Sequence, residues 1–386
     1  MLLGSLSFLM RAWLLFALSV LVSLPLFSGK PEQDSEKRLE TFVKEQGKKL
    51  SKNCPYRINL LTQGQTDKNS AGIRIAETAK QFADNKSGLL FFYQLYDHAM
   101  RVPHWHANAV EMGTVLSGKM RVVIWEGAGE RKEFTVEKDG TWMIPQAALH
   151  VLENVGNEEL TFLVAYNSPN AADRDFVTAW ASLPDMILES AVGLSKDEIA
   201  VIKKTTSNRL SSYDPSAHIE KGDINNPLSV SFARGAIFDG SLGSIKRVSL
   251  DNDSKSMGMT LQQTILKPNT LRVPHWYTAG DTLLYVEKGE GFFSMMTGEG
   301  KVYNIMLKRG DLISLPVGTF HSFLNVGKND LAIYEVFNTA KDIEEITLLE
   351  GAKQLSQGTL SGATGLSKES VQKIAHAKDR PYMVAF

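Results

Sequence analysis

Four residues in the first half of the chain have side chains and spacings suited to binding a divalent metal. His104 and His106 are separated by one residue, so in a β-strand both imidazoles project from the same face. Glu111 follows after a short polar turn, and His150 belongs to a later segment. Three imidazoles and one carboxylate suit Mn, Fe, Ni or Zn, and an octahedral ion held by these groups would keep two positions open. We therefore predict a metal site that can also bind a ligand.

The spacing of the four residues argues against the alternative that they are unrelated hydrogen-bonded side chains. They belong to the pattern His-x-His-x4-Glu-x6-Gly, which ends at Gly118, and to Pro-x4-His-x3-Asn, which begins at Pro145. These patterns resemble both signature motifs of the cupin family. One position departs from the family, because Ala147 replaces the glycine that usually follows the proline by two residues.

From residue 72 onward the chain contains a long internal repeat. Residues 104, 118, 145, 150 and 154 have counterparts at 275, 289, 316, 321 and 325, a constant offset of 171. Two copies of one domain are the simplest explanation. The second copy keeps His275 and His321 but has Tyr277 and Thr282 in place of the second histidine and the glutamate. We expect this copy to have lost its metal and to serve packing and assembly; the alternative is a different ligand pocket formed by the two histidines and Tyr277.

The elements that must position these residues are short strands. Each copy has β-branched or aromatic runs separated by Gly, Pro, Asn and Asp, a pattern typical of antiparallel sheet. Residues at helical spacing follow, at 176–204 and 341–377, and Ser195 and Ser367 are predicted to begin helices. We predict a mainly β protein with two tandem cupin domains, each a jelly-roll (double-stranded β-helix) barrel followed by short helices.

The first 29 residues combine Arg11 with an apolar run that ends in a proline and small residues. This is typical of a secretory signal peptide, so we expect an exported (secreted, periplasmic or other extracytoplasmic) protein that is free of the membrane after cleavage. An uncleaved anchor is the alternative, because the cleavage site lacks a clean small-x-small triplet. We divide the chain into a signal peptide (1–29), a charged N-terminal segment (30–54), a first cupin domain with the metal site (55–204), a linker (205–226) and a second cupin domain with a degenerate site (227–386).

Length and composition limit the classes of partner. The 386 residues can form two domains with full cores. A net charge of -1 with 22% charged residues gives no support for nucleic-acid binding, so we expect a small molecule as partner and treat a homo-oligomer as an option. Cys54 is the only cysteine, which excludes an intramolecular disulfide.

The whole portion after the first 29 residues resembles the bicupin oxalate decarboxylase family. In that family an arginine three residues before the first ligand histidine binds a carboxylate of the substrate, and Arg101 and Arg272 occupy this place. The planar guanidinium can pair with a carboxylate through two hydrogen bonds. The resemblance implies that Mn, or a similar metal, holds one carboxylate of oxalate while Arg101 binds the other, with dioxygen as redox partner.

The chain departs from these decarboxylases in the segment where they carry a proton-donating glutamate on a mobile lid. That glutamate aligns with Ala171 or Ala172, and Asp173 is the nearest carboxylic acid, with a side chain one methylene shorter. We expect an oxalate-decarboxylase-like enzyme that forms formate and carbon dioxide, with Asp173 as the proton donor. Without a donor, oxalate oxidation or another small-carboxylate reaction is the competing prediction. From a different class, a non-catalytic extracellular cupin would bind a small acid or have a structural role.

Overall fold

The computed structural model describes residues 31–386 with gaps at 78–80, 83–86, 128–130, 206–207, 215, 217–226, 251–257, 341–342 and 380–381. The predicted signal peptide and most of the predicted linker lie outside the described residues. The chain divides into two units between residues 44 and 45. The charged N-terminal segment contains helix α2 (Pro31–Gly47). None of the described helices is long and apolar enough to cross a membrane.

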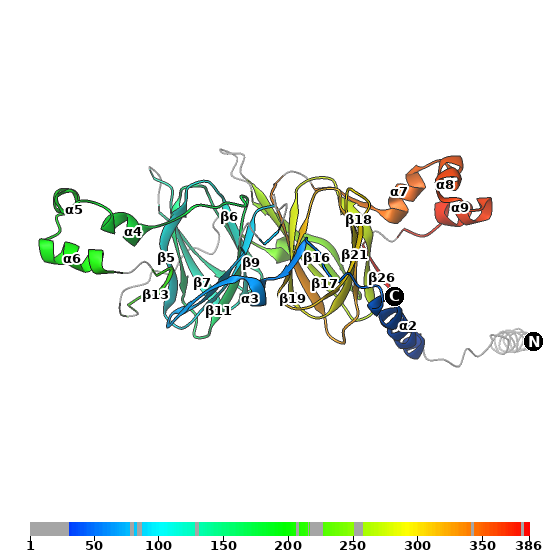
Figure 1. Ribbon diagram of the computed structural model, residues 1–386, viewed down its shortest axis with the longest axis horizontal. Helices are drawn as coiled ribbons and strands as arrows, with labels where there is room; N and C mark the ends of the chain where they lie inside the picture. The colour runs from blue at the N-terminus through cyan, green and yellow to red at the C-terminus, as the bar shows by residue number, and fades with distance from the viewer. Residues whose placement is uncertain are drawn as a thin grey trace, which may run out of the picture. The chain divides into compact units, whose positions relative to one another are not determined.

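Two antiparallel sheets form the first barrel, within residues 45–386 (Figure 1). One has seven strands: β2 (Gln65–Asn69), β3 (Gly72–Ala76), β4 (Leu89–Leu95), β6 (Glu111–Ser117), β9 (Gly140–Ile144), β11 (Leu160–Tyr166) and β14 (Ser229–Ser231). The other has six: β5 (Ala99–His106), β7 (Lys119–Trp125), β8 (Lys132–Glu137), β10 (Leu149–Asn154), β12 (Asp173–Asp175) and β13 (Leu210–Ser212). Their strand orders are β14-β9-β6-β11-β4-β3-β2 and β12-β5-β10-β7-β8, with β13 also paired to β5.

The second barrel repeats this arrangement. Its seven-stranded sheet contains β1 (Arg57–Asn59), β15 (Ala236–Gly240), β16 (Gly243–Leu250), β17 (Met259–Leu266), β19 (Thr282–Lys288), β22 (Asp311–Leu315) and β24 (Leu331–Phe337). The six-stranded sheet contains β18 (Thr270–Tyr277), β20 (Gly291–Met296), β21 (Val302–Leu307), β23 (Phe320–Asn325), β25 (Glu345–Thr347) and β26 (Met383–Ala385). The equivalent strands β5 and β18 share one pattern of buried and half-buried residues over all eight positions. The sequence repeat is therefore also a structural repeat.

Each barrel borrows one short strand from the segment that precedes the other barrel. Strand β1 pairs with β22 of the second barrel, and β14 pairs with β9 of the first. The first exchange is reinforced by Arg57, whose guanidinium lies 2.8 Å from the buried carboxylate of Asp311. The predicted domain boundaries at 55 and 227 follow the sequence repeat. Each predicted domain, however, begins with a strand that joins a sheet of the other barrel.

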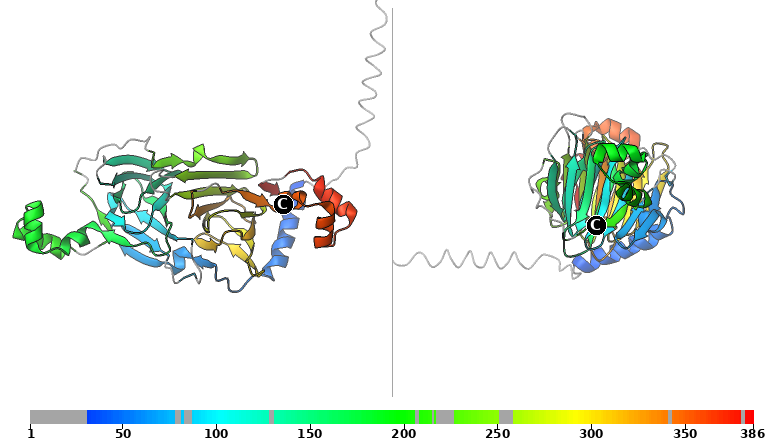
Figure 2. Two further views of the ribbon diagram at one scale, coloured as in Figure 1. Left: turned by 90° about the horizontal axis from the view of Figure 1, so that it is seen from above. Right: turned by 90° about the vertical axis from the view of Figure 1, so that its left-hand side faces the viewer.

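Short helices follow each barrel. After the first come α4 (Phe176–Ala181), α5 (Asp185–Val192) and α6 (Lys196–Lys204), and after the second α7 (Leu348–Gln354), α8 (Gln357–Thr364) and α9 (Lys368–Ala375) (Figure 2). Ser195 and Ser367 cap α6 and α9 as predicted, each accepting a hydrogen bond from a backbone N–H three residues later. Helix α3 (Leu60–Gln63) lies between β1 and β2, and a 3-10 turn, η1 (Phe232–Arg234), lies between β14 and β15. The predicted mainly β architecture, two tandem barrels each followed by short helices, is confirmed.

Candidate metal centre

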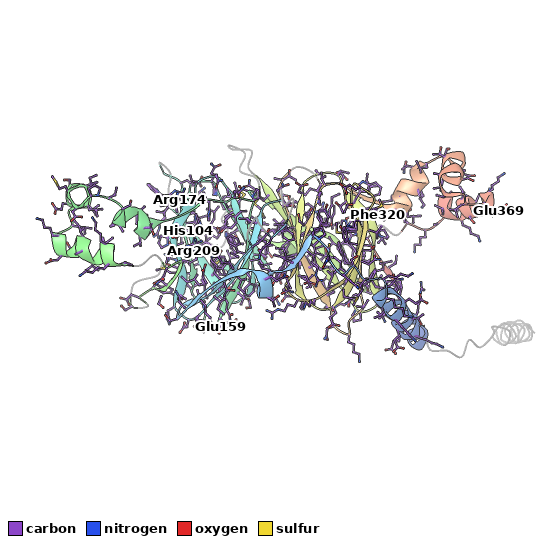
Figure 3. All side chains as sticks on the ribbon, viewed as in Figure 1. His104, Glu159, Arg174, Arg209, Phe320 and Glu369 are labelled. Atoms are coloured by element: carbon purple, nitrogen blue, oxygen red, sulfur yellow. The ribbon has the colours of Figure 1, made fainter. Side chains whose placement is uncertain are left out.

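The four predicted metal ligands lie close together in the first barrel, where Figure 3 labels His104. His104 and His106 project from β5, Glu111 begins β6, and His150 lies on β10. One nitrogen or oxygen atom from each of these side chains lies within 4.8 Å of the corresponding atoms of the other three. All four side chains are buried, with at most 3% of any residue exposed. The sequence separation between His106 and His150 is closed by the pairing of β5 with β10, which places His104 opposite His150.

Backbone carbonyls orient two of the imidazoles. His104 Nδ1 donates to the carbonyl of Val102 at 2.7 Å, and His150 Nδ1 donates to that of Ala148 at 2.9 Å. In a neutral imidazole this fixes the proton on Nδ1 and leaves the lone pair on Nε2. His150 Nε2 lies 3.5 Å from Glu111 Oε2 and has no hydrogen-bond partner among the described residues. A buried lone pair without a donor is what a metal ligand presents before the ion is added.

The charges at the centre suit a divalent cation. Burial lowers the pKa of His104 well below its ordinary value and also lowers that of His106, so these imidazoles are neutral. Burial would raise the pKa of Glu111, but the adjacent imidazoles of His150 and His106 outweigh it and hold the pKa of this carboxyl well below its usual range. Neutral imidazoles and an ionised carboxylate are the protonation states that bind metals. The donor set therefore fits Mn, Fe, Ni or Zn.

Trp142 positions the carboxylate and was missed by the sequence analysis. Its indole Nε1 donates to Glu111 Oε1 at 3.1 Å. The indole fits over Gly113, where an added Cβ would lie 2.3 Å from a ring carbon of Trp142. In the second copy the equivalent residues are Ile313 and Leu284. The sequence offered one signal for the role of Trp142: the indole is present only in the copy that keeps the ligand glutamate.

The turn before His150 contains the residue that departs from the cupin motif. Ala147 has a φ of +62°, in the left-handed region, and the equivalent Gly318 has +77°. Both turns make the same contact, since the backbone N–H of Ala147 donates to the carbonyl of His106 at 2.9 Å and that of Gly318 to Tyr277 at 3.1 Å. The alanine therefore keeps the glycine turn geometry at a conformational cost of roughly 1 kcal/mol.

Arg101 is buried beside the four ligands and pairs with the segment that follows β11. The register of β5 on β10 shifts between Arg101 and His104, and this irregularity accounts for both side chains being buried despite their odd spacing. Strand β12 pairs with β5 and sets Asp173 opposite His106. Arg101 donates to Asp173 Oδ2 at 2.5 Å and to Asp175 Oδ1 at 3.1 Å. The guanidinium predicted to bind a substrate carboxylate thus already binds two carboxylates of the chain.

A second arginine reaches the same oxygen. Arg209 Nη1 donates to Asp173 Oδ2 at 3.0 Å, and Figure 3 shows His104, Arg174 and Arg209 on neighbouring parts of this barrel. Burial would raise the pKa of Asp173, but the charges of Arg101 and Arg209 lower it. An ionised carboxylate held in this way has no proton to give. The role of Asp173 as proton donor therefore stays a prediction, and it requires this ion pair to open.

The second barrel keeps a buried arginine that is ion-paired with a carboxylate, but its described residues include no cluster of four metal ligands. Arg272 is ion-paired with Glu345, which occupies on β25 the place that Asp173 has on β12. Within the described residues, the first barrel has the only group of three or more His, Cys, Asp or Glu side chains placed to hold a metal. This agrees with the loss of two ligands at Tyr277 and Thr282.

The comparisons with known proteins define the family. The Cupin family model matches residues 58–200 and 231–372. The chain therefore belongs to the cupin family and contains two cupin domains in tandem. It is similar to oxalate decarboxylase OxdC of Bacillus subtilis (28% identical over 150 residues, 39% of each chain) and to an oxalate decarboxylase of Arthroderma benhamiae (29% over 127 residues, 33% of this chain and 30% of the other).

A plant protein and a solved structure are also similar to this chain. Germin-like protein 3-3 of Oryza sativa is 39% identical over 71 residues, 18% of this chain and 31% of its own. The aligned parts span well under two thirds of the length of these three relatives. The structure of the Bacillus subtilis oxalate decarboxylase matches with a TM-score of 0.76 at 16% identity, over 87% of this chain and 90% of the other. This match shows that the two chains share the bicupin fold.

Proposed function

We propose that the first cupin domain catalyses Mn-dependent breakdown of oxalate to formate and carbon dioxide. The observation that carries this proposal is the buried Arg101, which binds carboxylates next to the cluster of His104, His106, Glu111 and His150. A dicarboxylate of two carbons would match a site with a guanidinium on one side and a metal on the other. The similarity to two oxalate decarboxylases, and the Mn(II) centres of the Bacillus subtilis protein, support both the substrate and the metal.

The residues of this chain have separable tasks in such a reaction. The three histidines and Glu111 would hold Mn, which when bound supplies a Lewis acid and one-electron chemistry with dioxygen. Arg101 binds and orients the distal carboxylate of the substrate through its planar fork. Trp142 fixes Glu111, and burial of the site keeps bulk water away. Asp173, once separated from Arg101, would be the carboxylic acid that delivers a proton.

Oxalate oxidation is the second candidate, and one observation favours it. Asp173 is ion-paired with Arg101 and Arg209, so the arrangement in the structure has no protonated acid at this position. A substrate that has lost carbon dioxide without receiving a proton is oxidised further, with peroxide as the product of dioxygen. A non-catalytic cupin that binds a small acid is the remaining alternative.

One assay separates the three functions. Protein loaded with Mn is incubated with oxalate in air, and oxalate, formate and hydrogen peroxide are measured, with metal-free protein as control. We expect oxalate to be converted to formate without matching peroxide. Peroxide in place of formate identifies an oxidase. Binding of oxalate without consumption by fully loaded protein excludes both enzymes.

A further inference from the structure

The second barrel contains two buried imidazoles, each with one ring nitrogen hydrogen-bonded to the backbone. His275 Nδ1 donates to the carbonyl of Val273 at 2.7 Å, and His321 Nδ1 donates to that of Thr319 at 2.8 Å. Both Nε2 atoms are buried and lack a hydrogen-bond partner in the described part of the chain. A buried acceptor left unsatisfied costs about 1–3 kcal/mol, so native proteins rarely leave two together. A bound ion or group that accepts the lone pairs of both Nε2 atoms would remove this cost.

The third corner of this site is Tyr277. The ring centroids of His275 and His321 are 4.2 Å apart, against 4.0 Å for the metal-site pair at 104 and 150. The Tyr277 ring lies 5.2 and 5.5 Å from these two imidazoles, and the corresponding distances from the histidine at 106 are 4.9 and 5.2 Å. The three rings of the second barrel thus reproduce the three-histidine triangle of the first to within about 0.3 Å, with a phenol at one corner.

The side chains that contact the Tyr277 hydroxyl are polar, unlike those at the equivalent positions of the first barrel. Tyr277 Oη donates to Glu335 Oε1 at 3.1 Å and accepts a hydrogen bond from Gln262 Nε2 at 3.0 Å. Glu335 and Gln262 are fully buried on the paired strands β24 and β17. The equivalent residues of the first barrel are Val164 and Phe91, which are apolar. The second barrel therefore has a buried carboxylate that can take the phenol proton and an amide that can stabilise a phenolate.

We propose that His275, Tyr277 and His321 form a second metal site, which takes an oxidised ion that binds phenolate, with Cu²⁺ as the best match. Two imidazole nitrogens and one oxygen are a donor set typical of Cu²⁺, the ion that such sites bind most tightly among the divalent first-row metals. On binding, the phenol proton moves along the existing hydrogen bond to Glu335, whose carboxylic acid then donates back to the phenolate oxygen. Mn²⁺ binds most weakly in the same series, and with Thr282 in place of a ligand glutamate it is not retained.

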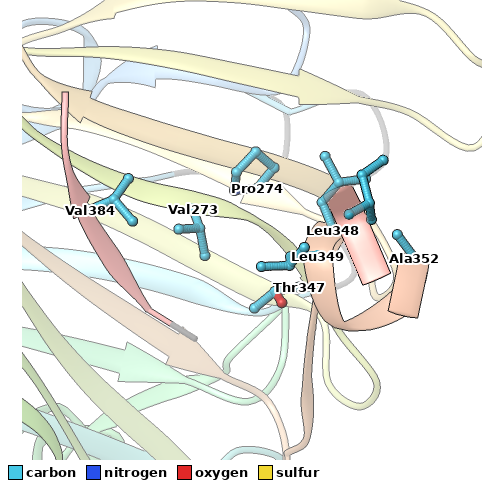
Figure 4. Close-up of a pocket in the computed structure, with 8 residues that line it drawn as sticks. Val273, Pro274, Thr347, Leu348, Leu349, Ala352 and Val384 are labelled. Atoms are coloured by element: carbon cyan, nitrogen blue, oxygen red, sulfur yellow. The ribbon is translucent and has the colours of Figure 1, made fainter. Parts of the chain in front are cut away.

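Two cavities adjoin the second barrel and differ in polarity. One, of about 200 Å³, is lined by charged residues, among them Arg247, whose Nε donates to Gln262 Oε1 at 2.9 Å. The other, of about 270 Å³, is lined by apolar side chains of β18 and α7 such as Val273 and Leu349 (Figure 4). A hydrated ion is stabilised by polar walls, so we expect the ion to enter from the polar cavity, where the lining residue Arg247 contacts Gln262.

The test is a titration with Cu²⁺ of the full-length protein carrying His106→Ala, which disables the competing site of the first barrel, followed by visible absorption and electron paramagnetic resonance. We expect a phenolate-to-copper charge-transfer band that saturates at one equivalent, with coupling to two nitrogens. Tyr277→Phe, which keeps the ring, should abolish the band, and His275→Ala should abolish both band and coupling. The matched control is Tyr166→Phe, which removes a phenol whose ring lies 4.6 Å from His106 in the first barrel.

Either of two results would overturn the proposal. One is a His106→Ala protein that shows no charge-transfer band when saturated with Cu²⁺. The other is a band that survives in Tyr277→Phe, or that is lost only in Tyr166→Phe, which would assign the colour to another tyrosine. Circular dichroism of each variant confirms that the barrels remain folded. None of these results depends on the activity proposed for the first barrel.

Discussion

Asp173 accepts a hydrogen bond from Arg101 at 2.5 Å, so the chain itself supplies a carboxylate to the guanidinium that is expected to bind the substrate. A substrate carboxylate that pairs with both Nη atoms of Arg101 has to displace this contact. The pairing of β12 with β5, three residues long, is the structure that has to loosen. Substrate binding and the release of Asp173 are therefore coupled, and a released carboxylate is also one that can be protonated.

The first prediction follows from this coupling. Asp173→Asn keeps the size of the side chain but removes both the competing charge and the proton donor. We expect oxalate to bind several-fold more tightly, because Arg101 is freed from an ionic partner, and formate production to fall by about tenfold or more. Calorimetry with oxalate and a formate assay measure the two effects separately.

Asp175→Asn is the matched control for this substitution. Asp175 also pairs with Arg101, at 3.1 Å, but it is the residue before α4 and is not predicted to donate a proton. Its replacement should leave the ratio of formate to peroxide unchanged. If Asp173→Asn and wild type give the same ratio and the same affinity for oxalate, Asp173 neither donates the proton nor competes with the substrate.

The second prediction concerns Arg101 itself. Arg101→Lys keeps the charge but loses the planar fork, so turnover of a dicarboxylate should fall by roughly tenfold or more at unchanged metal content. Arg272→Lys makes the same change at the equivalent position of the second barrel and should not affect turnover. Steady-state kinetics with metal analysis of each sample decides; unchanged kinetics in a fully loaded Arg101→Lys protein removes this residue from the site.

The third prediction concerns Trp142. Trp142→Phe preserves most of the ring packing but deletes the hydrogen bond to Glu111, so affinity for Mn should fall by about 10- to 100-fold, as is typical when an outer-shell partner of a ligand is lost. Competition with a metal chelator measures the change. An affinity equal to that of the wild type would mean that Glu111 is positioned without the indole.

The fourth prediction concerns the left-handed turn. Ala147→Gly should raise the free energy of unfolding by up to about 1 kcal/mol, because glycine adopts a positive φ without steric cost. Gly318→Ala, the reverse change in the second barrel, should destabilise by a similar amount. Denaturant unfolding of both variants checks the sign; stabilisation by Gly318→Ala would show that the conformation of the turn is not what determines these effects.

Much of the fold and the metal centre could be predicted from the sequence. The histidine spacing works because strand geometry places residues two apart on one face, and the repeat works because the offset between the copies is constant. The ion pair of Arg101 with Asp173 could not be predicted, since it depends on a bulge in β5 and on the register of a three-residue strand. Exchange of β1 and β14 between the barrels is hidden for the same reason: three residues carry almost no periodic signal.

The polar side chains around Tyr277 show a different limit of prediction from the sequence. Comparing the copies position by position reveals the loss of the ligand glutamate at Thr282. It does not reveal that a carboxylate is supplied from another strand, by Glu335, because that residue matters only through its hydrogen bond to Tyr277. The pairing of β17 with β24 sets Gln262 opposite Glu335, and Tyr277 reaches both from β18 of the other sheet.

The measurement that tests the account most directly is the Mn content of the purified, Mn-saturated protein and two variants. We predict about one Mn per chain in the wild type, loss of Mn in His106→Ala, and full retention in His275→Ala, because Mn requires the three histidines and Glu111 of the first barrel. Two equivalents of Mn in the wild type, or loss of Mn in His275→Ala with retention in His106→Ala, would contradict a single Mn centre in the first cupin domain.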